Sequence, residues 1–562
     1  MSNIWLDGIM GVVTGDALGN PVQFMSREEL KARGLVCGME AGGVYHTPIG
    51  TWTDDSSMTL ATLDSIKEVD AILPEDIMLK FVRWLYHGDF TPFGEAFDQG
   101  ITCSGAIESF NRNMKWKTCG KTGEKANGNG ALMRILPVCL FLIEKEDEKG
   151  DSFSLHDAVE STHQITSLTH NHLRAKMASG LYYFMAREIV RGSGSLIERL
   201  QKGLDRGFAY YGEDILNLTQ LSYLGRLRNL AELAAFGEDE IRSSGYVIDT
   251  IEAAVWSLIT TDSLKECLLK AVNLGKDADT VGAVAGGLAG LFYGYDAIPE
   301  DWLEVLQKRE WIEELCTWNY KSPIPVTDIH AHMIPGIDDG SRDIDMTMEM
   351  IRCACRQGVR GIVCTPHGDG LRFKKDLEKG WEEILRRCSV LYPDLKLGLG
   401  CELYLFPGNA KESIEGLRSG EYLPLNGTNY VLVEFSQSGL PFERIQEFVM
   451  ELKGAGWIPV IAHTERYYKS YRGIEDVCWL KEQGCKIQIN VYSLAGERKQ
   501  MIVDLARQMV KEKLVDFLGT DSHRMSHRPP KIANGMKELM EIADPEYVKR
   551  IAYENARDLL GM

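Results

Sequence analysis

The sequence has no Cys-x-x-Cys pair, although it contains 13 cysteines among its 562 residues. An odd number of scattered cysteines excludes a complete disulfide framework and a zinc ribbon, and we expect reduced, mostly buried thiols. No uninterrupted apolar run approaches the roughly 18 residues that cross a bilayer. The amino terminus lacks the basic stretch of a secretory signal, and Asp7 and Asp16 interrupt its apolar residues. We therefore expect a cytoplasmic protein without a membrane anchor.

Basic residues are fewer than acidic ones: the sequence contains 62 Lys and Arg residues and 81 Asp and Glu residues, which gives a net charge of −19. Nucleic acids and anionic membranes would not be attracted to such a chain, so we expect neither as a partner. Solvated surface acids explain most of such an excess, and metal-binding carboxylates are a second source. The composition, 44% hydrophobic and 25% charged, is that of a soluble globular protein.

A chain of 562 residues is too long for one hydrophobic core and predicts at least two domains. Residues 1–318 show apolar residues at helical spacing and few alternating stretches, which predicts an all-α domain. Residues 319–325 contain two prolines and form a short linker, and residues 326–562 alternate strand and helix patterns. The clearest helical patterns of the first domain are Ile77–Tyr86, Leu173–Arg191, Ile248–Thr260 and Ser263–Val272.

Two clusters of acids and hydroxyls in the first domain precede apolar helical segments. The first is Thr53-Asp54-Asp55, and the second is Asp277-Ala278-Asp279-Thr280. Helix capping accounts for a single acid or threonine at such a position. Paired carboxylates beside a hydroxyl are more than a cap requires, and they supply the hard oxygen ligands that Mg²⁺ or Mn²⁺ prefers. Two such ions would hold a diol and activate a water.

Several motifs of the first domain, in their order along the chain, resemble the ADP-ribosylglycohydrolase family: Gly15-Asp16-Ala17-Leu18-Gly19, Thr53-Asp54-Asp55, Gly128-Asn129-Gly130-Ala131, Leu168-Thr169-His170 and Gly275-Lys276-Asp277-Ala278-Asp279-Thr280. The resemblance implies an all-α fold and two Mg²⁺ or Mn²⁺ ions. The ligands it implies are Thr53, Asp54, Asp55, Asp277, Asp279 and Thr280. It also implies that Asn129, Gly130 and His172 lie along a bound ADP-ribose. Catalytic roles fall to Asp54, Asp55 and Asp279.

Two positions depart from that family pattern. Gln23 stands where the GDALG-x-P-V-x-F motif often carries glutamate, and Leu173 follows His172 where proline is common. The first change would weaken acid–base function or alter the accepted leaving group. The acidic clusters themselves are unchanged.

The second domain has candidate strands that end in ligand-capable residues. These strands are Val326–Ile329, Gly361–Thr365, Lys396–Gly400, Tyr430–Phe435, Ile458–Ala462, Lys486–Asn490 and Val515–Gly519. His330 and His332 follow the first of them, and alternate residues of an extended chain point to one face. The carboxyl ends of the strands of a β/α barrel converge on one site. A capped turn or a satisfied buried histidine explains one such residue, but not the whole series.

The series DIHAHMIPGIDDG, TPH, GCELY, VEFS, IAHTERY and GTDSHRMSHRPP resembles the polymerase-and-histidinol-phosphatase (PHP) superfamily. More closely, it is similar to the bacterial tyrosine phosphatases associated with capsule and exopolysaccharide control. The resemblance implies a distorted (β/α)₇ barrel with up to three metals, usually Mn²⁺. The ligands it implies are His330, His332, His367, Glu402, Glu434, His463, Asp521 and His523. Asp339 matches the acid of the first motif, and Gly368 stands where relatives often have His or Arg.

Arg466 and Arg528 match the arginines that hold phosphate in these enzymes, and we assign both to substrate binding and catalysis. A planar guanidinium suits a phosphate dianion. A cluster of cations lowers the pKa of a bound water toward neutrality and stabilises charge growing on phosphorus. No cysteine has an arginine six residues later, so the Cys-x₅-Arg phosphatase mechanism is excluded.

The sequence thus predicts a bifunctional metal-dependent hydrolase. Its first domain would remove ADP-ribose from a protein or small molecule, and its second would hydrolyse phosphotyrosine or a small phosphomonoester. One alternative is a coupled pair acting on a single metabolite, such as a derivative of ADP-ribose or a nucleotide. Another is a regulatory module, in which the half that bears Gln23 binds ADP-ribose without cleaving it.

Overall fold

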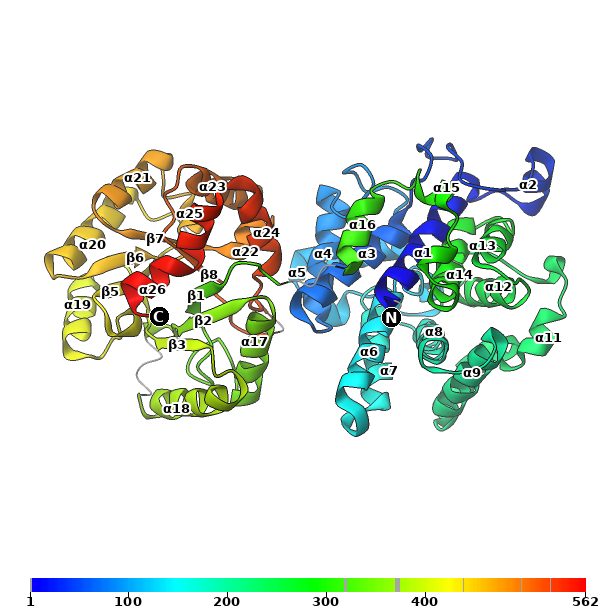
Figure 1. Cartoon of the computed structure of the whole chain (residues 1–562), viewed down its shortest axis with the longest axis horizontal. Coiled ribbons are helices and arrows are strands. Elements are labelled where there is room, and N and C mark those ends of the chain that lie inside the picture. Colours follow the sequence, from blue (N-terminus) through cyan, green and yellow to red (C-terminus); the bar gives the residue numbers. More distant parts are fainter. Residues whose placement is uncertain (1–2, 318–320, 369–373, 438, 497, 526) are drawn as a thin grey trace. The chain divides into compact units, whose positions relative to one another are not determined.

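The computed structural model describes residues 3–317, 321–368, 374–437, 439–496, 498–525 and 527–562. The chain divides into two compact units, the first built of helices and the second of parallel strands and helices (Figure 1). None of the described helices combines the length and the apolar character needed to cross a membrane.

All regular elements of residues 3–317 are helices, as the sequence predicted. The α-helices are α1 (Ile4–Gly19), α2 (Arg27–Arg33), α3 (Asp54–Val69), α4 (Pro74–His87), α5 (Ile101–Asn113), α6 (Leu136–Lys149), α7 (Leu155–Thr166), α8 (Leu173–Arg191), α9 (Leu196–Gly212), α10 (Leu218–Leu221), α11 (Leu230–Ala234), α12 (Val247–Ile259), α13 (Leu264–Val272), α14 (Ala278–Tyr293), α15 (Glu300–Leu303) and α16 (Arg309–Thr317). The four predicted helical segments correspond to α4, α8, α12 and α13. Both acidic clusters lie at helix starts, on α3 and α14, which confirms that part of the prediction.

Helices α1 and α14 pack backbone to backbone through glycines. A Cβ atom built on Gly15 would lie 2.0 Å from the Gly282 carbonyl oxygen, a distance at which no side chain fits. Farther along, a Cβ atom on Gly19 would lie 2.3 Å from the Asp279 nitrogen. The absence of side chains here allows the close approach, as small residues do between packed helices. Because of this contact, the end of α1 lies against the acidic start of α14.

The second unit alternates strands with helices. The strands are β1 (Val326–Ala331), β2 (Val359–Cys364), β3 (Lys396–Leu399), β4 (Glu402–Leu405), β5 (Tyr430–Phe435), β6 (Ile458–Ile461), β7 (Lys486–Asn490) and β8 (Phe517–Gly519). The helices are α17 (Ile344–Arg356), α18 (Lys374–Leu391), α19 (Ala410–Ser419), α20 (Phe442–Gly454), α21 (Ile474–Glu482), α22 (Val491–Leu494), α23 (Gln500–Lys511), α24 (Ala533–Ile542), α25 (Pro545–Lys549) and α26 (Asn555–Leu560).

The parallel strands close into a distorted barrel. Strand order is β1-β2-β3 in one sheet and β4-β5-β6-β7-β8 in the other. The two sheets join where Ala331 pairs with Ser522 and where His367 pairs with Glu402, both in parallel fashion. The first junction is supported by a 2.8 Å hydrogen bond from the His332 nitrogen to the Ser522 carbonyl. Closure brings the carboxyl ends of all strands to one rim.

One predicted strand is followed directly by a strand that the sequence did not predict. The predicted strand Lys396–Gly400 corresponds to β3, and after a break at Gly400 and Cys401 the chain forms β4. The Cys401 nitrogen donates to the Leu423 carbonyl at 3.0 Å instead of continuing the ladder with β2. Glu402 therefore begins a strand rather than following one. The barrel has seven strand positions, the third of which holds both β3 and β4.

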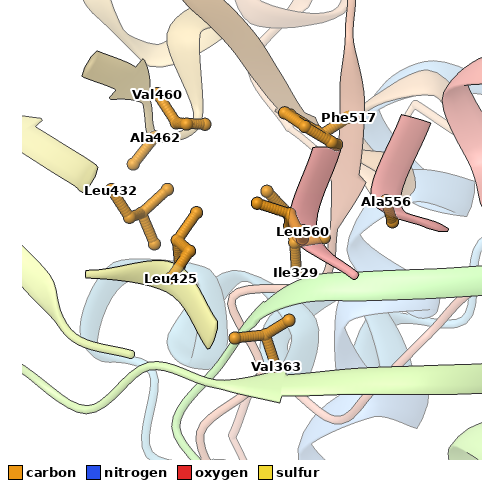
Figure 2. Close-up of a cluster of buried hydrophobic side chains, with 9 residues drawn as sticks. All are labelled: Ile329, Val363, Leu425, Leu432, Val460, Ala462, Phe517, Ala556 and Leu560. Atoms are coloured by element: carbon orange, nitrogen blue, oxygen red, sulfur yellow. The ribbon is translucent and has the colours of Figure 1, made fainter. Parts of the chain in front are cut away.

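An apolar core fills the barrel below the rim (Figure 2). It contains strand residues Ile329, Val363, Leu432, Val460 and Phe517, together with Leu425, Ala462 and two residues of α26, Ala556 and Leu560. On β5, Leu432 and Glu434 share one face because side chains alternate along a strand. The interior therefore changes from apolar to polar towards the carboxyl ends of the strands.

Two candidate metal centres

The first candidate centre lies where α3 and α14 begin. The Thr280 hydroxyl donates to Asp55 Oδ2 at 3.3 Å, which joins two segments separated by 225 positions in the sequence. The negative charges of Asp279 and Asp277 raise the pKa of Asp54 and Asp55, respectively. All six predicted ligands of this domain thus belong to one neighbourhood.

Asp16 of α1 holds the segment that carries the first acids. Its carboxylate accepts hydrogen bonds from the backbone nitrogens of Thr53, at 2.9 Å, and Ser56, at 3.0 Å. The Ser56 hydroxyl donates to it as well, at 2.5 Å. Burial raises the pKa of Asp16 to about 6. Asp16 therefore fixes the start of α3, which carries Asp54 and Asp55.

The carboxylates of this centre are buried among like charges. Burial raises the pKa of the Asp54, Asp55 and Asp279 carboxyls well above the ordinary value, and neighbouring aspartates raise it further. Asp55 Oδ1 and Asp279 Oδ1 are buried without a hydrogen-bond partner. Bare carboxylates in such a site carry a large desolvation cost, which a divalent cation removes. The all-oxygen donor set fits Mg²⁺ or Mn²⁺.

The second candidate centre lies at the rim of the barrel, around Glu402 of β4. Glu402 lies 3.2 Å from His330 Nε2 and 3.4 Å from His332 Nε2. It also lies 3.2 Å from both His367 Nδ1 and His463 Nε2. Although burial opposes ionisation, these histidines hold the pKa of Glu402 well below its ordinary value. Glu402 is thus the common neighbour of four predicted ligands.

The remaining predicted ligands surround this core. Asp521 Oδ1 lies 3.6 Å from His330 Nε2 and 3.5 Å from His332 Nε2. His463 Nε2 lies 3.6 Å from Glu434 Oε1. His523 Nε2 lies 3.3 Å from the exposed carboxylate of Asp339, which also approaches His367. Every ligand predicted for the second domain therefore reaches one cluster.

Three groups within this cluster have the spacing of a cation site. Their ligand atoms lie within 4.8 Å of one another: His332, Asp339, His367 and His523; His330, His332 and Glu402; and His367, Glu402 and Glu434. His463 Nδ1, on the ring whose Nε2 faces Glu402, is buried without a hydrogen-bond partner. A mixed set of imidazoles and carboxylates suits Mn²⁺ and similar divalent ions.

Two side chains outside the predicted ligand set, those of Asp338 and Gln488, orient the histidines of the cluster. Asp338 Oδ2 lies 2.7 Å from His332 Nδ1 and accepts from the His367 nitrogen at 3.0 Å. Gln488 of β7 lies 3.2 Å from His330 Nδ1 and accepts from the His463 nitrogen at 2.7 Å. Such contacts set which imidazole nitrogen faces the cluster. Gln488 could not be recognised from the sequence, because a glutamine within a strand pattern belongs to no motif.

Arg466 and Arg528 converge on Asp521 at the edge of the cluster. Their guanidinium nitrogens lie 2.6 Å and 2.8 Å, respectively, from Asp521 Oδ2. Arg466 is also within 2.5 Å of the Tyr492 hydroxyl. The two cations therefore stand together beside the predicted ligands, where an anionic substrate would meet both.

The model of the ADP-ribosylglycohydrolase family matches residues 5–328, more than half of the sequence. The chain belongs to the ADP-ribosylglycohydrolase family. Over 317 residues it is 33% identical to an ADP-ribosylarginine hydrolase, Tri1, of Serratia proteamaculans, covering 55% of this chain and 76% of the relative. It is 30% identical over 305 residues to the ADP-ribosyl-[dinitrogen reductase] glycohydrolase of Rhodospirillum rubrum, covering 54% of this chain and 90% of the relative. A solved ADP-ribosylglycohydrolase-related protein complex matches with 28% identity and a TM-score of 0.44, covering 56% of this chain and 95% of that one.

The second unit has relatives of its own. The model of the family of capsular polysaccharide synthesis proteins CpsB/CapC matches residues 326–561, and the unit is a CpsB/CapC-type tyrosine phosphatase domain of the PHP superfamily. A putative tyrosine-protein phosphatase, CapC, of Staphylococcus aureus is 30% identical over 207 residues, covering 36% of this chain and 79% of the relative. The solved structures of YwqE from Bacillus subtilis and CpsB from Streptococcus pneumoniae, metal-dependent tyrosine phosphatases, match with 29% identity and a TM-score of 0.37, covering 42% of this chain and 94% of that one.

The ADP-ribosylglycohydrolase domain contains an acid that the sequence did not single out. Asp98 raises the pKa of Asp54, after burial, more than any other charge does, and it also acts on Asp55, Asp277 and Asp279. Its carboxylate accepts a 2.8 Å hydrogen bond from the Tyr45 hydroxyl. A single acid in a loop forms no pattern, so only the folded chain reveals it.

The three residues predicted to lie along ADP-ribose, Asn129, Gly130 and His172, have different surroundings in the structure. The Asn129 amide donates to Asp277 and to the Thr250 hydroxyl, so it borders the acidic centre. A Cβ atom on Gly130 would lie 3.0 Å from His170 Cε1, which leaves no room for a larger residue. His172 caps α8 by accepting from the Arg174 nitrogen at 3.2 Å. Its role towards a ligand stays a prediction, since capping already explains the side chain.

Gln23, which replaces the glutamate common in ADP-ribosylglycohydrolases, is buried. Its amide donates to Asn20 Oδ1 at 3.3 Å. Asn20 in turn donates to the Thr51 carbonyl at 2.8 Å, just before the first acidic cluster. Gln23 therefore supports the segment leading to Asp54.

Proposed function

We propose that this chain is a bifunctional metal-dependent hydrolase. The first domain would cleave the glycosidic bond between ADP-ribose and a modified arginine, the linkage named for its relatives from Serratia and Pseudomonas putida. The second domain would hydrolyse phosphotyrosine, the substrate class named for its relatives. Two observations support the proposal: the acids and hydroxyls that meet at the starts of α3 and α14, and the cluster of histidines and carboxylates at the rim of the barrel.

In the first domain, Thr53, Asp54, Asp55, Asp277, Asp279 and Thr280 would hold two Mg²⁺ or Mn²⁺ ions. Bound there, the ions would offset the buried negative charge and supply an activated water next to the ribose hydroxyls. Asp16 keeps the start of α3 in position through its hydrogen bonds to Thr53 and Ser56. Asn129, held between Asp277 and Thr250, would orient the sugar. Asp98 adds a further negative charge that acts on these carboxyls.

In the second domain, the ligand cluster around Glu402 would hold up to three Mn²⁺ ions. They would supply a nucleophilic water and neutralise charge on the phosphoryl group. Arg466 and Arg528 would bind the phosphate oxygens, since a guanidinium offers two parallel donors. Asp521 holds both arginines at 2.6 and 2.8 Å and so presets their direction.

The test separates the two activities in one protein. ADP-ribose release from an ADP-ribosyl-arginine substrate and phosphate release from a phosphotyrosine peptide are measured for three proteins. These are the wild type, the Asp54→Asn/Asp55→Asn variant and the His330→Ala/His332→Ala variant. Each double variant should lose one activity by at least about 100-fold and keep the other within about twofold. Elemental analysis should show a matching loss of bound metal.

Three results would count against the proposal. Loss of both activities in either variant would mean that the sites are not independent. Retention of both would refute the site assignments. Tight binding of ADP-ribose without release from any ADP-ribosylated substrate would favour the regulatory module over the hydrolase.

A further inference from the structure

A cavity of about 450 Å³ opens beside the cluster in the barrel. At one end it is lined by His367 and Glu434, which belong to the cation-ligand groups. Its remaining wall includes three aromatic side chains, Tyr404, Phe406 and Tyr422. This volume lies in the range of small-ligand sites, and polar side chains, among them Asn409, Glu412 and Ser413, also line it. The aromatic residues have no part in the metal or phosphate assignments above.

The strand β4 carries the cluster and the aromatic wall on one face. Side chains alternate along a strand, so Glu402 and Tyr404 share a side, and Phe406, just after the end of β4, lines the same cavity. In the parallel register, Tyr404 pairs with Glu434 of β5. The wall therefore begins at Tyr404, two residues beyond Glu402 along β4 and beside Glu434. A group bound against it would extend from the cluster towards solvent.

The two rings of this wall are both accessible and held in place. Tyr404 and Phe406 are 45% and 46% exposed, and their ring centroids lie 5.9 Å apart at an interplanar angle of 35°. The Asn409 amide donates to the Tyr404 carbonyl at 2.9 Å, and its oxygen accepts from the Phe406 nitrogen at 3.0 Å. One side chain thus fixes the turn that presents both rings. Exposed aromatic residues on a fixed turn are typical of a binding surface.

The opposite side of the cavity depends on a glycine. A Cβ atom on Gly368 would lie 3.2 Å from Tyr422 Cε1 and 3.3 Å from its Cδ1, tighter than most contacts of real side chains. The Tyr422 ring itself packs against Gly416 of α19, so it has little room to retreat. Gly368 follows His367 directly. The absence of a side chain there keeps the space between the cluster and Tyr422 open.

We propose that Tyr404, Phe406 and Tyr422 form an aryl-binding wall, which selects phosphomonoesters of an aromatic alcohol over those of an aliphatic one. The inference rests on the proposed phosphatase function and assigns the residues that set its specificity. With the phosphate at the cluster and at Arg466 and Arg528, the phenyl ring of phosphotyrosine reaches the wall. The single methylene of phosphoserine is too short to do so. Gly368 contributes to the same selectivity, because a larger side chain at this position would narrow the space for the phenyl ring.

The test compares one peptide carrying either phosphotyrosine or phosphoserine. For each variant, kcat/KM is measured on both peptides with the full chain, and their ratio is expressed relative to the wild type. Tyr404→Ala and Phe406→Ala should each lower this ratio by about 2- to 10-fold, the effect of losing one aromatic contact. Tyr404→Phe should keep the ratio of the two kcat/KM values at the wild-type level, because the aromatic ring remains. Val390→Ala, at a site of α18 that is 77% exposed and not among the cavity residues, is the matched control and should leave the ratio unchanged.

A binding measurement makes the result independent of turnover. Phenylphosphonate and methylphosphonate are titrated into each protein by calorimetry. The preference for the phenyl compound should fall in Tyr404→Ala and Phe406→Ala, and also in Gly368→Leu, whose side chain enters the cavity. Turnover of phosphotyrosine with unchanged ratios and unchanged phosphonate preference in all three variants would overturn the aryl wall alone. Failure of the wild type to hydrolyse either peptide would overturn the proposed phosphatase function and the wall with it.

Discussion

The Thr280 hydroxyl donates to the same Asp55 oxygen, Oδ2, that the Thr53 hydroxyl contacts, both at 3.3 Å. The other oxygen of Asp55 is buried and has no hydrogen-bond partner. Two hydroxyls from distant helix starts therefore orient one carboxylate and leave its second oxygen for a ligand. This arrangement costs stability in the absence of a cation, because the neighbouring acids repel one another.

We expect Asp279→Asn to stabilise the metal-free protein and to abolish ADP-ribosyl hydrolysis. Removing one buried charge relieves the repulsion from Asp55 and Asp277, so the first unit should unfold about 2–4 °C higher after chelation. Added Mn²⁺ should raise the unfolding temperature of the wild type but not that of the variant. Calorimetry with and without chelator measures both effects. An equal gain from Mn²⁺ in the two proteins would show that Asp279 holds no metal.

Gln488 should matter for metal affinity although it is not a predicted ligand. Gln488→Leu removes the contacts to His330 Nδ1 and to the His463 nitrogen and frees both groups to move. Loss of such supporting contacts weakens metal binding by about 10- to 100-fold. The Mn²⁺ concentration that gives half-maximal phosphatase activity should rise accordingly. Gln508→Leu, on the exposed face of α23, is the matched control, and the same rise there would discount the argument.

The fold and most of the site follow from local patterns in the sequence. The His330-x-His332 pair and the acids after other strands mark strand ends because each depends only on period-two alternation and on a change from apolar to polar residues. Barrel closure then brings these ends together without further information. The starts of α3 and α14 are marked in the same way, by acids and threonines ahead of an apolar run.

The parts that the sequence did not reveal depend on contacts between distant residues. Asp98 acts on Asp54 only because the fold brings its loop there, and Gln488 has a role only through His330. The break at Cys401 follows from a hydrogen bond to Leu423, which no local propensity encodes. His172 shows the converse, since a residue within a recognisable motif also serves as a helix cap.

The close packing of α1 and α14 predicts a sharp contrast between two glycines. In Gly15→Ala, the new Cβ would lie 2.0 Å from the Gly282 carbonyl, so the helices must separate. We expect the first unit to lose about 3 kcal/mol or more and the acidic centre to lose its geometry. In Gly225→Ala, the new Cβ meets nothing within 4 Å, and stability should change by less than about 1 kcal/mol. Calorimetry identifies the transition that Gly15→Ala shifts as that of the first unit, and similar effects of the two variants would contradict this packing.

Glu252 of α12 predicts how the stability of the same unit depends on pH. Burial raises the pKa of Glu252 to about 7, Asp249 adds to the rise, and Arg226, 3.1 Å away, opposes it. Because the folded pKa lies above the unfolded value of about 4.3, the stabilisation is complete below that value and is lost as the pH rises through 7. At pH 8 the charged wild-type residue should therefore cost on the order of 3–4 kcal/mol relative to pH 4. Glu252→Gln, which stays neutral, should raise the unfolding temperature of the first unit by several degrees at pH 8 and much less at pH 5. Glu213→Gln, at an exposed position, should change neither value, and an equal effect of Glu252→Gln at both pH values would mean that burial does not govern this carboxyl.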